Sequence, residues 1–219
     1  MRHADVAYVD AEGRPVRPDE VLLTPVGVEQ AHAAAVLFAG IRFDKVVTSG
    51  LPRTLQTAGI VAPGLEPEAW PDLREIEPGG PGDLDEEEIE AAFLTAFRGL
   101  VPLERRFLGG ETFGSLVDRV VPAVERLRAD PAWDTALAVL HGAVNRAVIS
   151  YALTGERCFL GGLEQAPGCV TVLDVGDEDW VVRTAGLAPY DLLQAGTRET
   201  TMELLFAEFR DRTQTRPGA

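Results

Sequence analysis

Two strand-turn-helix units constrain this chain to an α/β fold. The first unit is an apolar strand over residues 43–49 followed by helical periodicity over 52–61. The second is a continuous apolar run over 136–140 followed, after a two-residue turn, by a helix over 143–153. Repeated units of this kind predict a mostly parallel central sheet with helices on both faces, a three-layer α/β/α sandwich.

Helix signals are clearest in the segment before the first unit. Thr24 suits an N-cap, Pro25 suits the first helical position, and an Ala-rich apolar face continues to Phe38. The other predicted elements are a helix over 111–129, a closing hairpin of strands over 169–175 and 180–183 around the turn 176–179, and a final helix over 197–210.

A segment of different composition separates the two units. Residues 76–110 contain Pro-Gly-Gly-Pro-Gly at 78–82, an acidic run at 83–90 and a helix predicted to end near Leu100. We interpret this segment as a small cap inserted over the sheet. Because 219 residues suit one hydrophobic core, we expect a single domain over 1–219 that includes this cap.

Charge and cysteine content limit the partners and the compartment. Lys and Arg total 20 against 35 Asp and Glu, a net charge of −15 that would repel nucleic acid and anionic membranes. Any phosphate site must therefore be a local concentration of Arg or backbone N–H groups. The sequence has no signal-peptide pattern and no long apolar run, and Cys158 and Cys169 are expected to be reduced thiols, so we expect a cytoplasmic protein.

Two of the three histidines, His3 and His141, lie at turns where polar residues begin. His141 precedes a helix whose first N–H groups point back at the turn, where an anion fits. Arg53 begins the helix of the first unit, and its guanidinium can reach the same crevice. Taken alone, a histidine at such a turn is more often a structural hydrogen-bonding group than a catalyst, and Arg53 is equally well explained as a solvated residue at the start of a helix. The third histidine, His32, lies within a predicted helix.

Several short motifs occur in a fixed order along the chain. They are Met-Arg-His-Ala-Asp at 1–5, Leu-Thr-Pro-Val-Gly-Val-Glu-Gln-Ala at 23–31, Ser-Gly-Leu-Pro-Arg-Thr-Leu-Gln-Thr-Ala at 49–58, Leu-Arg-Glu at 73–75, Gly-Gly-Glu-Thr at 109–112 and His-Gly-Ala-Val-Asn-Arg at 141–146. In this order they resemble the histidine phosphatase superfamily, the phosphoglycerate-mutase-like proteins, over nearly the whole chain.

This resemblance implies roles for individual residues. His3 would attack phosphorus, and Glu75 would handle the proton of the leaving group, with Glu77 as the alternative acid. The phosphoryl oxygens would be bound by a clamp made of Arg2, Arg53, His141 and Gly142. Two guanidiniums and a protonated imidazole would stabilise a phosphoryl transition state without a metal or another cofactor.

The chain departs from the superfamily pattern near its start. The apolar first strand that usually precedes Arg-His is not in this sequence, so either the numbering starts late or the strand is missing. If the strand is missing, we expect His3 to lie at a fraying end. The residues at 4–8 also replace the usual Gly-Glu-Thr and a following Asn. In the cap, Arg98, Arg105 and Arg106 could offer charge to a second anionic group, although we expect at least two of them to be surface residues.

The predicted function is hydrolysis of a small phosphomonoester, from a phosphorylated metabolite, through a phosphohistidine on His3. One alternative is a mutase that returns the phosphoryl group to its substrate with the same residues. Another is a degenerate member of the family that binds a phosphorylated ligand without turnover. The apolar edge of the closing hairpin is compatible with a homodimer.

Overall fold

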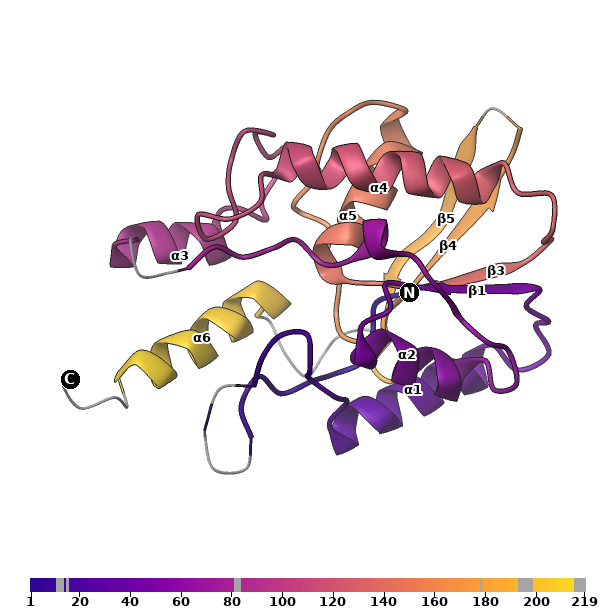
Figure 1. The fold of residues 1–219 in the computed structure, drawn as a ribbon, viewed down its shortest axis with the longest axis horizontal. Helices are drawn as coiled ribbons and strands as arrows, with labels where there is room; N and C mark the ends of the chain where they lie inside the picture. The colour runs from indigo at the N-terminus through magenta and orange to yellow at the C-terminus, as the bar shows by residue number, and fades with distance from the viewer. Residues whose placement is uncertain (11–13, 15, 81–83, 178, 193–198, 215–219) are drawn as a thin grey trace.

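A three-stranded parallel sheet lies between two layers of helices (Figure 1). The computed structural model describes residues 1–10, 14, 16–80, 84–177, 179–192 and 199–214. Within them β1 (Lys45–Thr48) pairs with β2 (Glu68–Ala69) on one side and with β3 (Ala136–Val139) on the other. Both pairings are parallel, which confirms the predicted α/β fold.

The N-terminal residues extend this sheet beyond β3. The backbone N–H of Leu140 donates to the carbonyl of Met1 at 2.9 Å, and the N–H of His3 donates to the carbonyl of Leu140 at 2.9 Å. On the other side, the backbone N–H of Arg2 donates to the carbonyl of Cys169 at 2.9 Å. His3 is therefore held between two chain segments, and the expectation that it lies at a fraying end is wrong.

Helices α1 (Pro25–Leu37) and α2 (Pro52–Val61) cover one face of the sheet, below it in Figure 1. The hydroxyl oxygen of Thr24 accepts from Gly27 N–H at 3.0 Å, which confirms the predicted N-cap. Gly27 is required there because a Cβ would lie 2.2 Å from the carbonyl oxygen of Asp5. The start of α1 thus packs directly on the segment that follows His3.

Helices α4 (Phe113–Arg128) and α5 (Gly142–Thr154) cover the opposite face, next to the larger hydrophobic core. The sequence predicts the antiparallel hairpin of β4 (Val170–Val175) and β5 (Trp180–Leu187), and in the structure this hairpin packs beside α5. One residue of its turn, at 178, lies outside the described part of the chain. A short 3-10 helix, η1 (Pro71–Leu73), packs against α4.

Helix α3 (Glu86–Leu94) and helix α6 (Thr201–Gln214) pack against each other at one end of the molecule (Figure 1). The ring centroids of Phe93 and Phe206 lie 5.7 Å apart in this contact. That residues 76–110 form an inserted cap on one single domain stays a prediction. In the described part of the chain, no helix is both long and apolar enough to cross a membrane.

Helix α3 ends earlier than predicted. It stops at Leu94 instead of continuing to about Leu100. Gly99 adopts a left-handed φ of 58°, and the following backbone pairs with a distant loop, where Val101 N–H donates to the carbonyl of Phe159 at 2.9 Å. These non-local hydrogen bonds replace the helical ones, which is a tertiary effect that local periodicity does not predict.

Candidate active site

His3 and His141 face each other at the carboxyl end of the sheet. His141 directly precedes α5 as its N-cap residue, and His3 follows the segment paired with β3. Their ring centroids lie 5.2 Å apart in an edge-to-face arrangement, and the exposed fractions are 2% for His3 and 0% for His141. The fold therefore brings together two histidines that are 138 positions apart in the chain.

Hydrogen bonding sets the state of the His3 ring. Its Nδ1 lies 2.8 Å from the carbonyl oxygen of Ala4, which can only accept, so Nδ1 carries the proton and Nε2 carries a lone pair. Burial, and then the charges of Arg2 and Arg53, hold the pKa of His3 well below its usual value. His3 is thus a neutral imidazole with one basic nitrogen, the form that a nucleophile requires.

His141 is also neutral. Its Nε2 lies 2.7 Å from the hydroxyl of buried Ser49, which follows β1. Its Nδ1 is buried and has no hydrogen-bond partner among the described residues. Burial, and then the neighbouring His3 and Arg53, lower the pKa of His141 well below its usual value. The protonated imidazole assumed from sequence therefore needs a bound anion to favour it.

Arg2 and Arg53 are buried, and each has one guanidinium nitrogen without a hydrogen-bond partner among the described residues. One guanidinium nitrogen of Arg53 donates to the carbonyl of Pro18 at 2.6 Å, and one of Arg2 donates to the carbonyl of Gln165. The Nε atom of each arginine is buried and unpartnered within the part of the chain that the structure describes. Because unpartnered buried donors are costly, these two nitrogens suit the oxygens of an anionic ligand.

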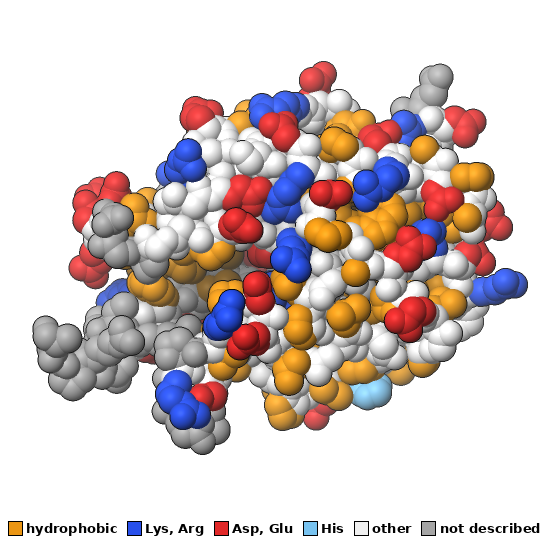
Figure 2. Space-filling view, in the orientation of Figure 1, with side chains coloured by type: hydrophobic (Ala, Val, Ile, Leu, Met, Phe, Trp, Pro, Cys, Tyr) orange, Lys and Arg blue, Asp and Glu red, His pale blue; other side chains and the backbone are white. Residues whose placement is uncertain are grey.

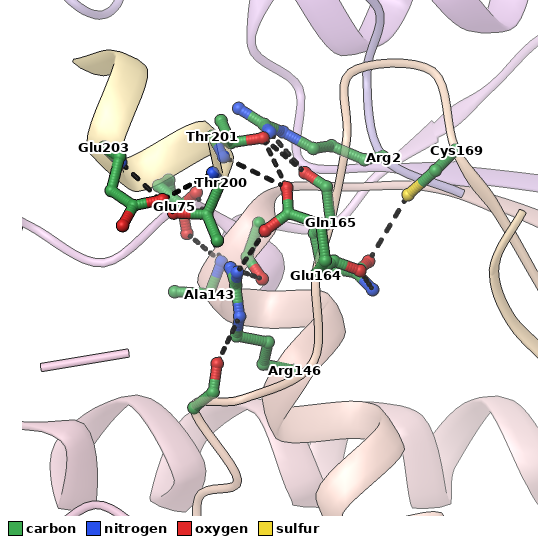
Figure 3. Close-up of polar contacts among 12 residues, drawn as sticks. Arg2, Glu75, Ala143, Arg146, Glu164, Gln165, Cys169, Thr200, Thr201 and Glu203 are labelled. Carbon is green, nitrogen blue, oxygen red and sulfur yellow. Dashed lines mark hydrogen bonds and ion pairs between the residues drawn. The ribbon is translucent and has the colours of Figure 1, made fainter. Parts of the chain in front are cut away.

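The N-terminus of α5 completes the site (Figure 3). Ala143 N–H donates to the Glu75 carboxylate at 3.1 Å, so this acidic side chain lies at the positive end of the helix. A Cβ on Gly142 would lie 3.7 Å from Glu75 Oε2 and 3.8 Å from Arg2 Nε. The absence of a side chain at Gly142 keeps open the space between the carboxylate and the guanidinium.

Sequence reasoning missed Arg119, which positions the Glu75 loop. The Arg119 guanidinium donates to the backbone carbonyls of Asp72 at 2.8 Å, Arg74 at 2.7 Å and Glu75 at 3.2 Å. It also pairs with the Glu111 carboxylate at 2.8 Å. The Gly-Gly-Glu-Thr motif contained Glu111, but the separation of 44 residues between Glu75 and Arg119 left no local signal for this contact.

The other predicted residues lie outside this centre. The Glu77 side chain is exposed, and its backbone N–H donates to Glu111 at 3.1 Å. Arg105 is half-buried and donates to the Thr95 hydroxyl at 3.2 Å, and Arg106 is exposed and donates to the carbonyl of Gly110 at 2.7 Å. Among the residues that the structure describes, no three His, Cys, Asp or Glu side chains are grouped so that they could hold a metal.

We expect the free energy of unfolding to fall as the pH drops below 6.5, the ordinary pKa of histidine. The unfolded chain then takes up protons that buried His3 and His141 do not, so stability is lost at about 1.4 kcal/mol per pH unit for each histidine until its lowered folded pKa is reached. Urea unfolding between about pH 5 and 7 should give a shallower pH slope for His141→Gln than for wild type.

The exposed His32 provides the control for this measurement. His32→Gln should keep the wild-type slope, because its side chain is not buried. Equal slopes for wild type and His141→Gln would contradict the assignment of a buried neutral His141.

Comparison with known proteins identifies the family of this chain. The sequence matches the histidine phosphatase superfamily (branch 1) over residues 1–187, and the chain belongs to this superfamily. It is 30% identical to a metal-independent phosphoserine phosphatase of Arabidopsis thaliana, over 83% of this chain and 77% of that protein. It is also 30% identical to the adenosylcobalamin/alpha-ribazole phosphatase of Salmonella typhimurium strain LT2, over 70% of this chain and 78% of that protein.

Other relatives share only part of their length with this chain. Bovine 6-phosphofructo-2-kinase/fructose-2,6-bisphosphatase 1 is 33% identical over 60% of this chain, a match that spans only 28% of that enzyme.

Among solved structures, a mycobacterial glucosyl-3-phosphoglycerate phosphatase with inorganic phosphate superimposes with a TM-score of 0.68 at 22% identity, covering 86% of this chain and 95% of that one. This last likeness concerns the fold.

Proposed function

We propose that this protein hydrolyses a small phosphomonoester without a metal, through a phosphohistidine intermediate on His3. The observation that carries the proposal is the neutral His3 ring with its basic Nε2, buried among Arg2, Arg53 and His141. Such a ring can attack phosphorus, and the open donors around it can bind the phosphoryl oxygens. Relatives that are phosphatases, including one of metal-independent type, support the same chemistry.

The reaction proceeds in two displacements. In the first, which begins with Glu75 protonated, Nε2 of His3 forms a bond to phosphorus while the ester P–O bond breaks, and Glu75 gives its proton to the departing oxygen. In the second, Glu75 takes a proton from water, the water oxygen bonds to phosphorus, and the P–N bond to His3 breaks. Inorganic phosphate leaves and both side chains return to their starting states.

Trapping the intermediate tests this proposal. Protein mixed with a ³²P-labelled phosphomonoester in the presence of EDTA, and then denatured rapidly in alkali, should carry label that is stable to base and released by acid, as expected for phosphohistidine. Peptide mapping should locate the label on His3. Steady phosphate release without any labelled protein, or label on a residue other than His3, would exclude the mechanism.

We also propose that the protein acts in the cytoplasm on a metabolite. Cys158 and Cys169 are both free thiols, which suits a reducing compartment. The net charge of −15 disfavours nucleic acid and anionic membranes as partners. A homodimer through the hairpin edge stays a prediction.

A further inference from the structure

A cavity of about 160 Å³ lies where α3, α5 and α6 meet. Figure 2 shows hydrophobic side chains in the hollow between α3 and α6. The cavity walls combine apolar and charged groups, chiefly Phe93, Leu94, Phe97, Arg146, Glu164 and Met202. Helix α6 begins at Thr201, beyond residues 1–187 that match the superfamily, so one wall is built by a part of the chain outside that match.

Arg146 connects this cavity to the catalytic centre. Its Nη1 lies 3.4 Å from the position that a Cβ of Gly142 would occupy. The same position lies 3.7 Å from Glu75 Oε2 and 3.8 Å from Arg2 Nε, the groups assigned to the leaving group and to the phosphate. A group leaving phosphorus near Glu75 therefore has Arg146 beside it (Figure 3), and Arg146 also lines the cavity.

Arg146 and Glu164 form an ion pair at the cavity without a direct hydrogen bond between them. Arg146 is 3% exposed, its Nε donates to the carbonyl of Gly161 at 3.1 Å, and its guanidinium lies 4.9 Å from the centre of the Phe97 ring. Its Nη2 donates no hydrogen bond to the described residues and lies 3.8 Å from Glu164 Oε2, beyond hydrogen-bond distance. The other Glu164 oxygen accepts from the Thr201 hydroxyl at 2.6 Å.

The charges around the cavity are balanced. Arg146 lies opposite Glu164, and Arg98 pairs with Glu203 at 3.6 Å. Among the residues that the structure describes here, each of these two arginines faces a carboxylate, so the described walls carry no unpaired positive charge for a second anion beyond the phosphate. A hydroxyl group both donates and accepts, so neighbouring hydroxyls satisfy Nη2 of Arg146 and Oε2 of Glu164 without added charge.

We infer that the substrate is the phosphomonoester of a small, uncharged polyol or sugar. The inference rests on the proposed phosphatase function. The hydroxyls of the leaving group bind between Arg146 and Glu164, and its C–H surface packs on Phe97. The cavity is about the size of one that binds benzene, so it selects a body of roughly six non-hydrogen atoms.

Kinetics with three phosphate esters test this inference. Glycerol 1-phosphate offers two hydroxyls, 3-phosphoglycerate replaces one of these groups by a carboxylate, and methyl phosphate does not reach the cavity. We expect kcat/KM to be about tenfold higher for glycerol 1-phosphate than for 3-phosphoglycerate, because the carboxylate would face Glu164. Equal values, or a preference for 3-phosphoglycerate, would overturn the inference.

Two variants examine the cavity itself. Glu164→Gln keeps an acceptor for Thr201 but removes a negative charge. The ratio of kcat/KM for glycerol 1-phosphate to that for 3-phosphoglycerate should therefore fall about tenfold. Leu94→Trp narrows the cavity from the opposite wall and should lower kcat/KM about tenfold more for glycerol 1-phosphate than for methyl phosphate. Glu208→Gln, an exposed charge change on α6, is the control and should leave both ratios unchanged.

The outcomes separate this inference from the proposed function. If wild type hydrolyses methyl phosphate and forms the phosphohistidine, but neither cavity variant changes a substrate ratio, the polyol site is wrong and the phosphatase function stands. If wild type neither turns over any ester nor becomes labelled, both proposals fail. Circular dichroism and thermal unfolding of each variant establish that the ratios are measured on folded protein.

Discussion

His3→Ala should lower phosphate release by at least about 10⁴-fold, because removal of a nucleophile abolishes the covalent route and leaves only the contribution of binding. In the described part of the chain, one other imidazole, that of His141, lies next to His3. His141, whose ring centroid is 5.2 Å from that of His3, already uses Nε2 with the Ser49 hydroxyl. The measurement is steady-state release of phosphate from an aryl phosphate, with EDTA present in every assay.

His32→Ala is the matched control for this experiment. It removes an exposed histidine from α1 and should leave the rate within about twofold of wild type. The proposed mechanism would be wrong if pure His3→Ala protein kept wild-type turnover. No turnover in either protein, together with tight phosphate binding, would instead favour the ligand-binding alternative.

Glu75→Gln should reduce steady-state turnover of alkyl phosphates by about 10²–10⁴-fold, the range expected for loss of a general acid and base. Glutamine retains an oxygen that can accept from Ala143 N–H and Ile76 N–H, so the loop geometry is preserved while the proton is lost. The effect should depend on the leaving group. Nitrophenolate needs no proton to depart, so its first equivalent should appear within about tenfold of the wild-type rate before a slow steady state.

Glu77→Gln distinguishes the two acids considered from sequence. Its side chain is exposed, so we expect little change in turnover with any leaving group.

Arg119→Lys retains one charge but loses the hydrogen bonds to three carbonyls of the Glu75 loop. It should lower turnover less than Glu75→Gln does, with the same dependence on the leaving group. Equal losses for alkyl and aryl esters would mean that Arg119 affects folding of the loop rather than the placement of its acid.

Local signals predicted much of the architecture. The bounds of α2, Pro52–Val61, agree with the prediction because Pro52 suits the first helical turn and an apolar face follows it. The Thr24 cap of α1 was predicted for the same kind of reason. Helix α6 begins at Thr201, later than its predicted start at 197, in a stretch whose first two residues lie outside the described part of the chain.

The candidate site depended on two kinds of information. The sequence by itself determined the residue types and their motifs, because Arg2-His3, Arg53 and His141 can be recognised without coordinates. Only the tertiary structure decided how they meet. The pairing of Met1 and His3 with Leu140 brings the nucleophile to His141, and burial there makes both rings neutral.

The same division holds for the contacts around Glu75. A carboxylate in a Pro/Gly-rich loop is usually solvated. The local sequence around Glu75 does not indicate that a guanidinium 44 residues away binds the carbonyls of this loop. The cavity beside Arg146 likewise requires α3, α5 and α6 to meet. Local periodicity specifies which face of a helix is apolar, whereas long-range packing decides what that face and its neighbouring charges enclose.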